Sequence, residues 1–389
     1  MSAPLRVAMI GNGFMGAAHS QGWRVAPRFF DLPLQPEMAV MVGRDAAKNE
    51  RLAAKWGWGE AASDWRAVVE RDDIDVVDIV TPGDLHAEIA IAALAAGKHV
   101  LCEKPLANNP GDAELMARAA ATARANGALA MVGFTYRRVP AATFARDMVA
   151  RGAVGTVRQV RAQYLQDWLS DPETPLTWRM QKDKAGSGAL GDIGAHAIDL
   201  SQFITGDLVT SVSGVLETFV AERPVLESSQ GLGGIAGTER GPVTVDDYAA
   251  FSGRYASGAM GLFEATRFST GRKNALRVEV SGDKGALAFD LEDMNSLQYY
   301  DATAPEDQRG FTKIYVTEPQ HPYIEAWWPA GHMLGYEHGF SHQVKDLVEA
   351  IATGEQPRPS FDDGFQVQRV LDAVERSSAA GSVWVSTDS

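Results

Sequence analysis

Cysteine is almost absent from this chain of 389 residues, in which Cys102 stands alone. A single cysteine excludes an internal disulfide and leaves too few thiolates for a structural zinc site. Basic residues are also scarce, because 36 lysines and arginines stand against 50 aspartates and glutamates and the formal net charge is −14. Nucleic acids and anionic membranes bind basic surfaces, so the sequence argues against both as partners.

The sequence also lacks an apolar stretch of membrane-spanning length, and its N-terminus shows no signal-peptide core or cleavage site. We therefore expect a cytoplasmic protein. No metal site is expected, because the histidines toward the C-terminal end have no carboxylates at metal-ligand spacing. These histidines are His321, His332, His338 and His342.

Short β-branched runs alternate with helical patterns through the first third of the chain. The pattern predicts strands over residues 6–10, 38–42, 76–80, 99–102 and 128–132, and helices over residues 17–25, 45–56, 85–96 and 112–126. Aspartates open the helices at 45 and 112. Such alternation produces right-handed crossovers and a parallel sheet covered on both faces. We therefore predict an α/β fold whose residues 1–134 form a doubly wound Rossmann domain that binds a dinucleotide.

The rhythm changes after about residue 136 to longer alternating strands separated by turn signals. Strands are predicted over residues 246–255, 259–268, 275–281, 286–291, 297–300 and 311–316, and helices over residues 189–204, 339–353 and 363–379. We predict that residues 135–389 form an α+β domain for substrate binding and oligomerisation, with a largely antiparallel open sheet. Residues 221–243 are rich in glycine and lack periodicity, so they form either a mobile flap or a long connection.

A glycine motif directly follows the first predicted strand and consists of Gly11-Asn12-Gly13-Phe14-Met15-Gly16. Its three glycines suit a tight turn, a close approach of backbone to pyrophosphate, and close packing of the next helix. The N–H groups at the start of that helix can hold phosphates. The motif alone is common, but its place between a strand and a helix favours a dinucleotide site.

The end of the second predicted strand bears on the choice between NAD and NADP. It reads Gly43-Arg44 and carries no carboxylate for the ribose hydroxyls of NAD. Arg44, with Lys48 one helical turn later, can pair with the 2′-phosphate of NADP. Asp45 is better interpreted as the cap of the following helix. These residues favour NADP.

Asp192, His196 and Asp199 recur along one side of the predicted helix over residues 189–204. An imidazole titrates near neutrality and can take a hydroxyl proton while a hydride leaves the same carbon. From spacing alone, a surface Asp–His pair that supports the helix is the more common interpretation.

Several motifs, taken in order along the chain, resemble those of the Gfo/Idh/MocA oxidoreductase family. They are the glycine motif, Thr81-Pro82 with His86, Glu103-Lys104-Pro105, and Gly191-Asp192-Ile193-Gly194-Ala195-His196. The resemblance covers almost the whole chain. Longer strings at residues 164–168, 175–179 and 186–192 are most similar to the family's glycoside 3-dehydrogenases and related anhydrosugar dehydrogenases.

The resemblance implies three catalytic residues: Lys104 hydrogen-bonds the reacting hydroxyl, Asp192 holds the sugar, and His196 acts as acid and base. It adds the residues Thr81, Pro82, His86 and Glu103 to the cofactor site. The implied activity is oxidation of a secondary hydroxyl, favoured at C3, of a pyranose, a glycoside or an anhydrosugar such as levoglucosan. The implied cofactor is NAD, and the implied assembly is a homodimer or homotetramer.

Tyr164, Gln166 and Trp168 alternate along a predicted strand, share one face, and suit a sugar-binding platform of rings and amides. Trp178 and Arg179 can add to it, and Tyr136 stands beside the wall of the active site that the resemblance implies. Tyr164 and Trp168 could equally be core aromatics.

The chain departs from the family pattern at two positions. Gly83 replaces a frequent Asn near the expected cofactor, and Thr135 replaces a frequent Asn beside the active-site wall. Two other functions stay open. One is redox-assisted cleavage of a glycoside through transient C3 oxidation, and the other is a non-catalytic sensor of sugar or dinucleotide. Lys104, Asp192 and His196 argue against a sensor, which needs no such set.

Overall fold

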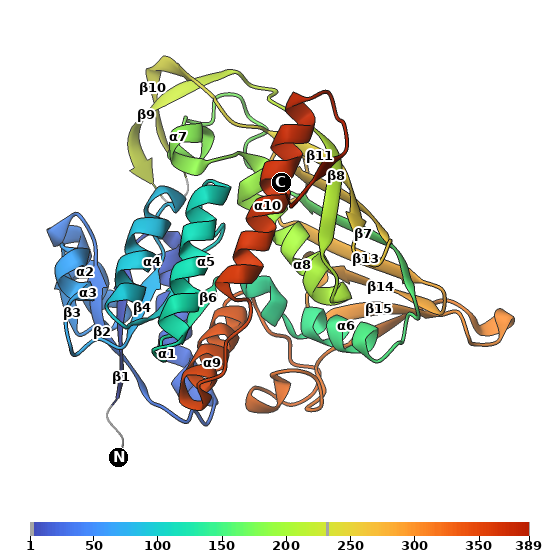
Figure 1. Cartoon of the computed structure of the whole chain (residues 1–389), viewed down its shortest axis with the longest axis horizontal. Coiled ribbons are helices and arrows are strands. Elements are labelled where there is room, and N and C mark those ends of the chain that lie inside the picture. Colours follow the sequence, from blue (N-terminus) through green and yellow to red (C-terminus); the bar gives the residue numbers. More distant parts are fainter. Residues whose placement is uncertain (1–3, 231–232, 389) are drawn as a thin grey trace. The chain divides into compact units, whose positions relative to one another are not determined.

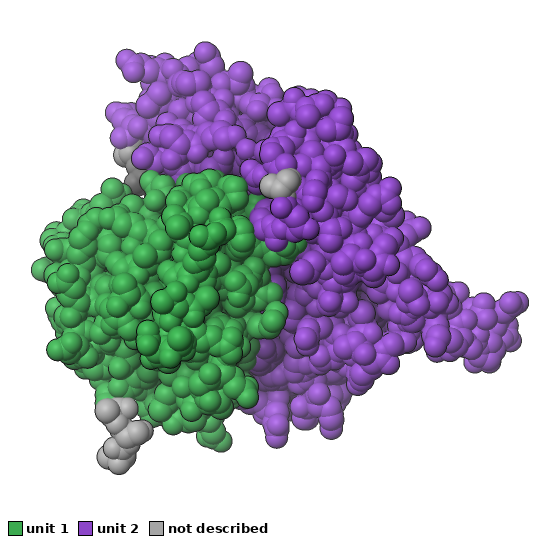
Figure 2. Space-filling model, viewed as in Figure 1, with its two compact units in different colours: residues 1–135, 335–368 green, residues 136–334, 369–389 purple. Residues whose placement is uncertain are grey.

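The computed structural model describes residues 4–230 and 233–388, and the chain divides into two compact units (Figure 1, Figure 2). Unit 1 comprises residues 1–135 and 335–368, and unit 2 comprises residues 136–334 and 369–389. The domain boundary predicted after residue 134 stays a prediction. No helix in the described part of the chain is long and apolar enough to cross a membrane.

Unit 1 contains a six-stranded parallel sheet with the strand order β3-β2-β1-β4-β5-β6. The strands are β1 (Leu5–Ile10), β2 (Pro36–Val42), β3 (Glu60–Ala62), β4 (Val76–Ile79), β5 (His99–Cys102) and β6 (Ala130–Val132). Five of them lie where strands were predicted, whereas the short β3 was missed. The strand order reverses between β1 and β4, which is the arrangement of a doubly wound Rossmann fold. This part of the fold prediction is confirmed.

Helices flank the sheet of unit 1 (Figure 1). They are α1 (Phe14–Phe29), α2 (Ala46–Trp56), α3 (Trp65–Val69), α4 (His86–Ala95), α5 (Pro110–Arg124) and α9 (His338–Thr353). Asp45 caps α2 as predicted, because its carboxylate accepts the Lys48 N–H at 3.0 Å. The predicted start of α5 at Asp112 was wrong. Asn109 is the cap, and its side chain accepts the Asp112 N–H at 2.9 Å.

Unit 2 contains a nine-stranded sheet with the order β16-β15-β14-β13-β7-β12-β11-β8-β17. The strands are β7 (Val157–Leu165), β8 (Val209–Glu217), β11 (Tyr248–Tyr255), β12 (Met260–Thr266), β13 (Ala275–Gly282), β14 (Gly285–Asp290), β15 (Ser296–Asp301), β16 (Phe311–Tyr315) and β17 (Val385–Ser386). Only β7 and β12 pair in parallel, and the other described neighbours are antiparallel. The largely antiparallel sheet is therefore confirmed.

Two longer helices of unit 2, α6 (Pro140–Ala150) and α8 (Ala195–Thr205), pack on this sheet. Between α6 and α8 the chain forms two short helical segments, α7 (Lys182–Ala185) and the π-helical turn Leu190–Gly194. Helix α10 (Phe361–Ala379) contributes its first residues to unit 1 and the rest to unit 2.

The prediction of an irregular segment over residues 221–243 was wrong. Strands β9 (Glu222–Gln230) and β10 (Gly233–Pro242) pair antiparallel there, and residues 231–232 lie outside the described residues. Register shifts within the pair break the alternation that would have signalled strands. Arg223 anchors the hairpin, because its buried guanidinium donates to the carbonyls of Leu169 and Asp171 at 2.7 Å each.

Candidate cofactor site and candidate substrate site

The glycine loop of unit 1 has the shape that a pyrophosphate requires. Gly11 has a φ of +119°, and a Cβ there would lie 2.7 Å from the Val80 carbonyl oxygen. A Cβ on Gly16 would lie 2.9 Å from the Gly11 carbonyl oxygen, so the helix packs closely on the loop. Next to Gly13, by contrast, a Cβ would meet no atom within 4 Å. The loop is therefore tight where it turns and open where a phosphate must approach.

The first turn of α1 also fits an anion. Gly13 caps the helix without any side-chain hydrogen bond, and the turn holds no acidic residue. Phe14 is half exposed and stacks on Tyr336 of the same unit, with ring centroids 6.4 Å apart, while Met15 packs against the core. The backbone N–H groups at this helix start can bind phosphate oxygens.

The end of β2 is shaped by two asparagines that the sequence did not single out. Asn12 donates to Asn49 at 3.0 Å, and a Cβ on Gly43 would lie only 2.2 Å from the Asn12 nitrogen. Gly43 is thus required by packing. Arg44 and Lys48 are both exposed beside it, and their contact with a cofactor stays a prediction.

His86 ties together the two segments expected around the nicotinamide. It is buried, with Nε2 3.0 Å from the Thr81 carbonyl oxygen and Nδ1 3.0 Å from the Pro105 carbonyl oxygen. Burial lowers the pKa of His86, whereas hydrogen bonds to the carbonyls of Thr81 and Pro105 raise it. The structure therefore gives His86 a bracing role between the loop at Thr81-Pro82 and the turn that carries Lys104.

The space left by Gly83 is filled by another amide. A Cβ at position 83 would lie 2.4 Å from Oδ1 of Asn108. The carboxamide missing at position 83 is therefore matched by the carboxamide of Asn108, which reaches the same place from the segment after Lys104. Asn108 was missed at the level of sequence, because nothing in the order of residues links positions 83 and 108.

Glu103 belongs to a buried charge network rather than to an open surface. One carboxylate oxygen lies 3.0 Å from His19 Nε2, and the other accepts the backbone N–H of Lys104 at 3.2 Å. His19 Nδ1 lies 2.9 Å from Asp78, and Trp23 donates to the same carboxylate at 2.7 Å. A charged residue inside the apolar strand β4 was the signal for this network, because a buried carboxylate needs partners.

Lys104 itself is half-buried and follows the carboxyl end of β5. Ligands of open α/β sheets bind at this edge. Its backbone is held from one side by Glu103, and the next residue, Pro105, is held by His86. The turn that presents the ammonium is thus fixed from two directions.

In unit 2, hydrogen bonds join four of the eight predicted substrate-binding residues, namely Tyr136, Tyr164, Gln166 and Trp168. Strand β7 ends at Leu165, so the prediction that Gln166 and Trp168 continue this strand with Tyr164 was wrong. The residues nevertheless connect side chain to side chain. Trp168 donates to Gln166 at 2.9 Å, and both Gln166 and Tyr164 donate to Asn274, at 2.8 Å and 2.6 Å. Asn274 is a member of the group that the motifs did not reveal.

His196 stands in the first turn of α8 beside two of these aromatic rings. Its ring centroid lies 4.6 Å from that of Tyr136 and 5.9 Å from that of Tyr164, and the two tyrosine hydroxyls are 2.9 Å apart. Tyr136 and Tyr164 are both buried. The structure therefore gathers the imidazole and the hydrogen-bonded chain from Tyr136 to Trp168 within one unit.

Asp192 lies in the π-helical turn before α8 and is oriented by a residue that the sequence did not single out. Arg267 Nη1 lies 3.3 Å from the Asp192 carboxylate. The Arg267 side chain is completely buried, whereas the Asp192 side chain is 28% exposed. The Arg267 guanidinium also lies over the ring of Trp168, 5.5 Å from its centroid. One buried cation thus contacts two predicted substrate residues.

Trp178 and Arg179 form a pair of their own in unit 2, with the guanidinium over the indole at 4.4 Å from the ring centroid. Burial lowers the pKa of Arg179, Asp192 raises it and Arg267 lowers it. These electrostatic couplings place Arg179 near the Asp192 carboxylate. Its contact with substrate stays a prediction.

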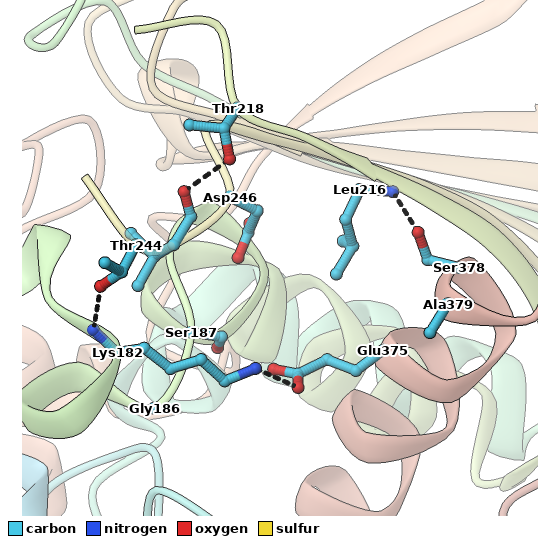
Figure 3. A pocket seen from close by; sticks show the side chains of 11 residues that line it. Lys182, Gly186, Ser187, Leu216, Thr218, Thr244, Asp246, Glu375, Ser378 and Ala379 are labelled. Atoms are coloured by element: carbon cyan, nitrogen blue, oxygen red, sulfur yellow. Dashed lines mark hydrogen bonds and ion pairs between the residues drawn. The ribbon is translucent and has the colours of Figure 1, made fainter. Parts of the chain in front are cut away.

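A cavity of about 320 Å³ lies behind the glycine segment that precedes Asp192 (Figure 3). Its lining includes Lys182, Ser187, Asp246 and Glu375, and Lys182 pairs with Glu375 at 2.9 Å. Buried Asp246 accepts the N–H groups of residues 188 and 190 at 2.7 Å each, which fixes the segment. The predicted catalytic residues of unit 2 do not line this cavity, so it serves as backing and not as the candidate substrate site.

Metal ligation has no candidate in residues 4–230 and 233–388, where no group of three or more His, Cys, Asp and Glu could hold an ion. His321 and His338 instead accept nearby backbone N–H groups, of Glu318 and Gly335, at 3.0 Å each.

Comparison with known proteins relates both units to one family. Residues 5–134 match the oxidoreductase family with an NAD-binding Rossmann fold, and residues 143–288 match the GFO/IDH/MocA C-terminal domain. The chain is 42% identical to levoglucosan dehydrogenase of Pseudarthrobacter phenanthrenivorans over 98% of this chain and 97% of that protein.

Solved structures agree with the sequence relatives. An oxidoreductase domain protein from Kribbella flavida has a TM-score of 0.95 and 62% identity, over 99% of this chain and 100% of the other. Levoglucosan dehydrogenase in complex with NADH and levoglucosan has a TM-score of 0.92 and 41% identity over 100% of both chains. The resemblance predicted from the motifs is confirmed. This chain belongs to the Gfo/Idh/MocA family of oxidoreductases, and its residues 5–134 form the family's NAD-binding Rossmann domain.

Proposed function

We propose that the chain is an NAD-dependent dehydrogenase that oxidises a secondary hydroxyl, with C3 favoured, of a pyranose, a glycoside or an anhydrosugar such as levoglucosan. The observation that carries the proposal is the hydrogen-bonded chain from Tyr136 to Trp168 beside His196. Rings, amides and hydroxyls in one group suit the apolar faces and polar edges of a pyranose. Similarity to levoglucosan dehydrogenase supports this substrate class.

The residues of the chain divide the chemistry between them. Oxidation removes a hydride from carbon and a proton from the hydroxyl, and NAD+ supplies the acceptor for the hydride. Lys104 would donate a hydrogen bond to the reacting oxygen and stabilise its developing negative charge. His196 would take the proton, which leaves a ketone and an imidazolium. Asp192, oriented by Arg267, would accept hydrogen bonds from other sugar hydroxyls.

NAD fits the residues of unit 1. The open side of Gly13 and the uncapped start of α1 can hold the pyrophosphate, and relatives of this chain are known in complex with NADH. Arg44 keeps NADP as a measurable alternative, since it is exposed beside the end of β2.

The test is a spectrophotometric screen that follows the absorbance of the reduced cofactor at about 340 nm. NAD+ and NADP+ are each tested with levoglucosan, glucosides, inositols and free hexoses. We expect NADH formation with a cyclic sugar and a 3-keto product by NMR. Lys104→Met should lower turnover about 10²-fold to 10³-fold, the cost of one lost oxyanion donor. Lys55→Met, at an exposed lysine of α2, is the matched control and should keep wild-type turnover.

Three results would contradict the proposal. Sugar cleavage without net NADH would indicate transient oxidation instead. Sugar and dinucleotide binding without any turnover would indicate a sensor. Near-normal turnover in Lys104→Met would remove Lys104 from the chemistry.

We also propose that the chain forms a homodimer or homotetramer. Sedimentation can measure this oligomeric state.

A further inference from the structure

Five side chains of unit 2 form a continuous chain of hydrogen bonds with Asn274 at its centre. Trp168 contacts Gln166 at 2.9 Å and Gln166 contacts Asn274 at 2.8 Å. From the other side, Tyr164 contacts the same Asn274 oxygen at 2.6 Å, and Tyr136 contacts Tyr164 at 2.9 Å. These hydrogen bonds thus connect Tyr136 with Trp168.

The direction of every hydrogen bond in this chain follows from Trp168, because an indole nitrogen can only donate. Gln166 must accept with its amide oxygen, so its amide nitrogen faces Asn274 and donates. Asn274 must then present its oxygen, which accepts from Gln166 and from Tyr164. Tyr164 has one hydroxyl proton, and that proton points at Asn274. The proton between the two tyrosines consequently belongs to Tyr136.

We propose that Asn274 is a positioning residue that makes Tyr136 a hydrogen-bond acceptor toward the substrate site. The hydroxyl proton of Tyr136 is committed to Tyr164, so its oxygen can only accept from a further partner. His196 is a neighbour of Tyr136, with ring centroids 4.6 Å apart. The further partner is accordingly an imidazole N–H of His196 or a hydroxyl of the sugar.

This inference rests on the proposed function and sharpens it in two ways. A tyrosine whose proton is already donated cannot protonate the ketone oxygen in the reverse reaction, which leaves that step to His196 or Lys104. A sugar group that faces Tyr136 must also be a donor. A hydroxyl satisfies this requirement, whereas a fluorine or a carbonyl oxygen at the same place does not, because it would face a second acceptor.

Two substitutions at Asn274 distinguish the effect of hydrogen-bond direction from the effect of side-chain packing. Asn274→Asp keeps an acceptor oxygen at this position and preserves the direction, so the variant should keep the wild-type preference between hydroxyl and fluorine. Asn274→Leu has a similar size but no acceptor, which frees the Tyr164 proton and lets Tyr136 donate. We expect Asn274→Leu to lower kcat/KM for the natural sugar about tenfold, as for one lost hydrogen bond. It should also improve the relative rate with one of a set of monodeoxyfluoro sugars.

Asn295→Leu is the matched control. Asn295 is another asparagine of unit 2, bonded at 2.9 Å and 2.8 Å to the backbone of Leu334. Its loss should change stability but not the preference between hydroxyl and fluorine. Equal effects of Asn274→Asp and Asn274→Leu, or an unchanged preference in Asn274→Leu, would overturn the proposal.

A neutron diffraction map of perdeuterated crystals tests the direction without substrate. The expected deuterons lie on Tyr164 toward Asn274 and on Tyr136 toward Tyr164. A deuteron on Tyr164 that points at Tyr136 would overturn the inference. If the wild-type chain oxidises no sugar, the proposed function fails, while the neutron map still decides what Asn274 does.

Discussion

The stability of unit 1 should fall as the pH rises, because His19 is buried between two carboxylates. Burial alone lowers its pKa, but Asp78 and Glu103 raise the pKa of His19 to about 10. In the unfolded chain a histidine titrates near about 6.5. The folded protein therefore holds this proton more tightly, so its stabilising contribution is complete below about pH 6.5 and is lost as the pH rises through about 10.

The size of this effect follows from the two pKa values. One pKa unit corresponds to about 1.4 kcal/mol, so the proton on His19 contributes at most about 5 kcal/mol to the free energy of unfolding. Cys102 also lies beside the network, and burial raises its pKa, so the thiol stays neutral and adds no charge of its own. His19 is therefore the group of this network whose loss of charge should govern the change in stability between about pH 6.5 and about pH 10.

The test is urea unfolding of the full-length wild type and of His19→Gln, which gives the free energy of unfolding of each at pH 6.5, 8 and 9.5. Wild type should lose stability across this range, and His19→Gln should show a flatter dependence. The variant should also be less stable near pH 7 by about 3–5 kcal/mol, because two buried carboxylates lose their cation. His99→Gln removes another histidine of unit 1, whose pKa burial lowers, so its charge does not change above pH 6.5 and the variant should keep the wild-type dependence. Identical slopes in wild type and His19→Gln would refute this reasoning.

Four further variants test the two candidate sites. Gly13→Val should abolish NADH binding in a fluorescence titration by filling the open side of the loop; a folded variant with normal titration would place the pyrophosphate elsewhere. Arg44→Ala should weaken NADP(H) binding more than NAD(H) binding, by about 1–3 kcal/mol, and equal losses would deny it any selective role. Arg267→Met should raise the KM for sugar about tenfold while NADH affinity stays constant, and an unchanged KM would contradict its positioning role. Gly83→Asn should weaken NADH binding by displacing Asn108, and adding Asn108→Gly should restore it. If the double variant does not recover NADH binding, the amides at positions 83 and 108 do not serve the same role.

The framework of both units could be predicted from sequence because hydrophobic periodicity reports burial directly. Five strands of the parallel sheet are apolar runs between helical patterns, and the hairpin strands of unit 2 alternate largely between buried and partly exposed positions. Strand β3 has three residues and no such pattern, so it gave no signal. The pair β9 and β10 was missed because register shifts interrupt its alternation.

The candidate site could be predicted only as far as its motifs reach. Lys104 and His196 stand in recognisable strings, whereas the residues that orient their surroundings do not. Asn274 contacts Tyr164 across 110 positions, and His19 contacts Glu103 across 84. The pairing of Asn274 with Tyr164 leaves no trace in local composition or spacing, and the only signal for the network of His19 is the charged Asp78 inside an apolar strand. Such contacts depend on how strands and helices meet, which periodicity within one segment does not encode.

Arg267 and His19, two supports that the sequence did not predict, are both buried cations. Burying a cation with its partner is a weak source of stability, since apolar side chains of similar volume often do as well or better. Arg267 is fully buried and ends on Asp192, and His19 is buried and ends on Glu103 beside the Lys104 backbone. In unit 1 the buried cation contacts Glu103, which directly precedes Lys104. In unit 2 the buried cation contacts Asp192, which itself has a proposed role in the reaction. We therefore assign to both cations a role in orienting those carboxylates, which for His19 comes in addition to the stability that its proton contributes.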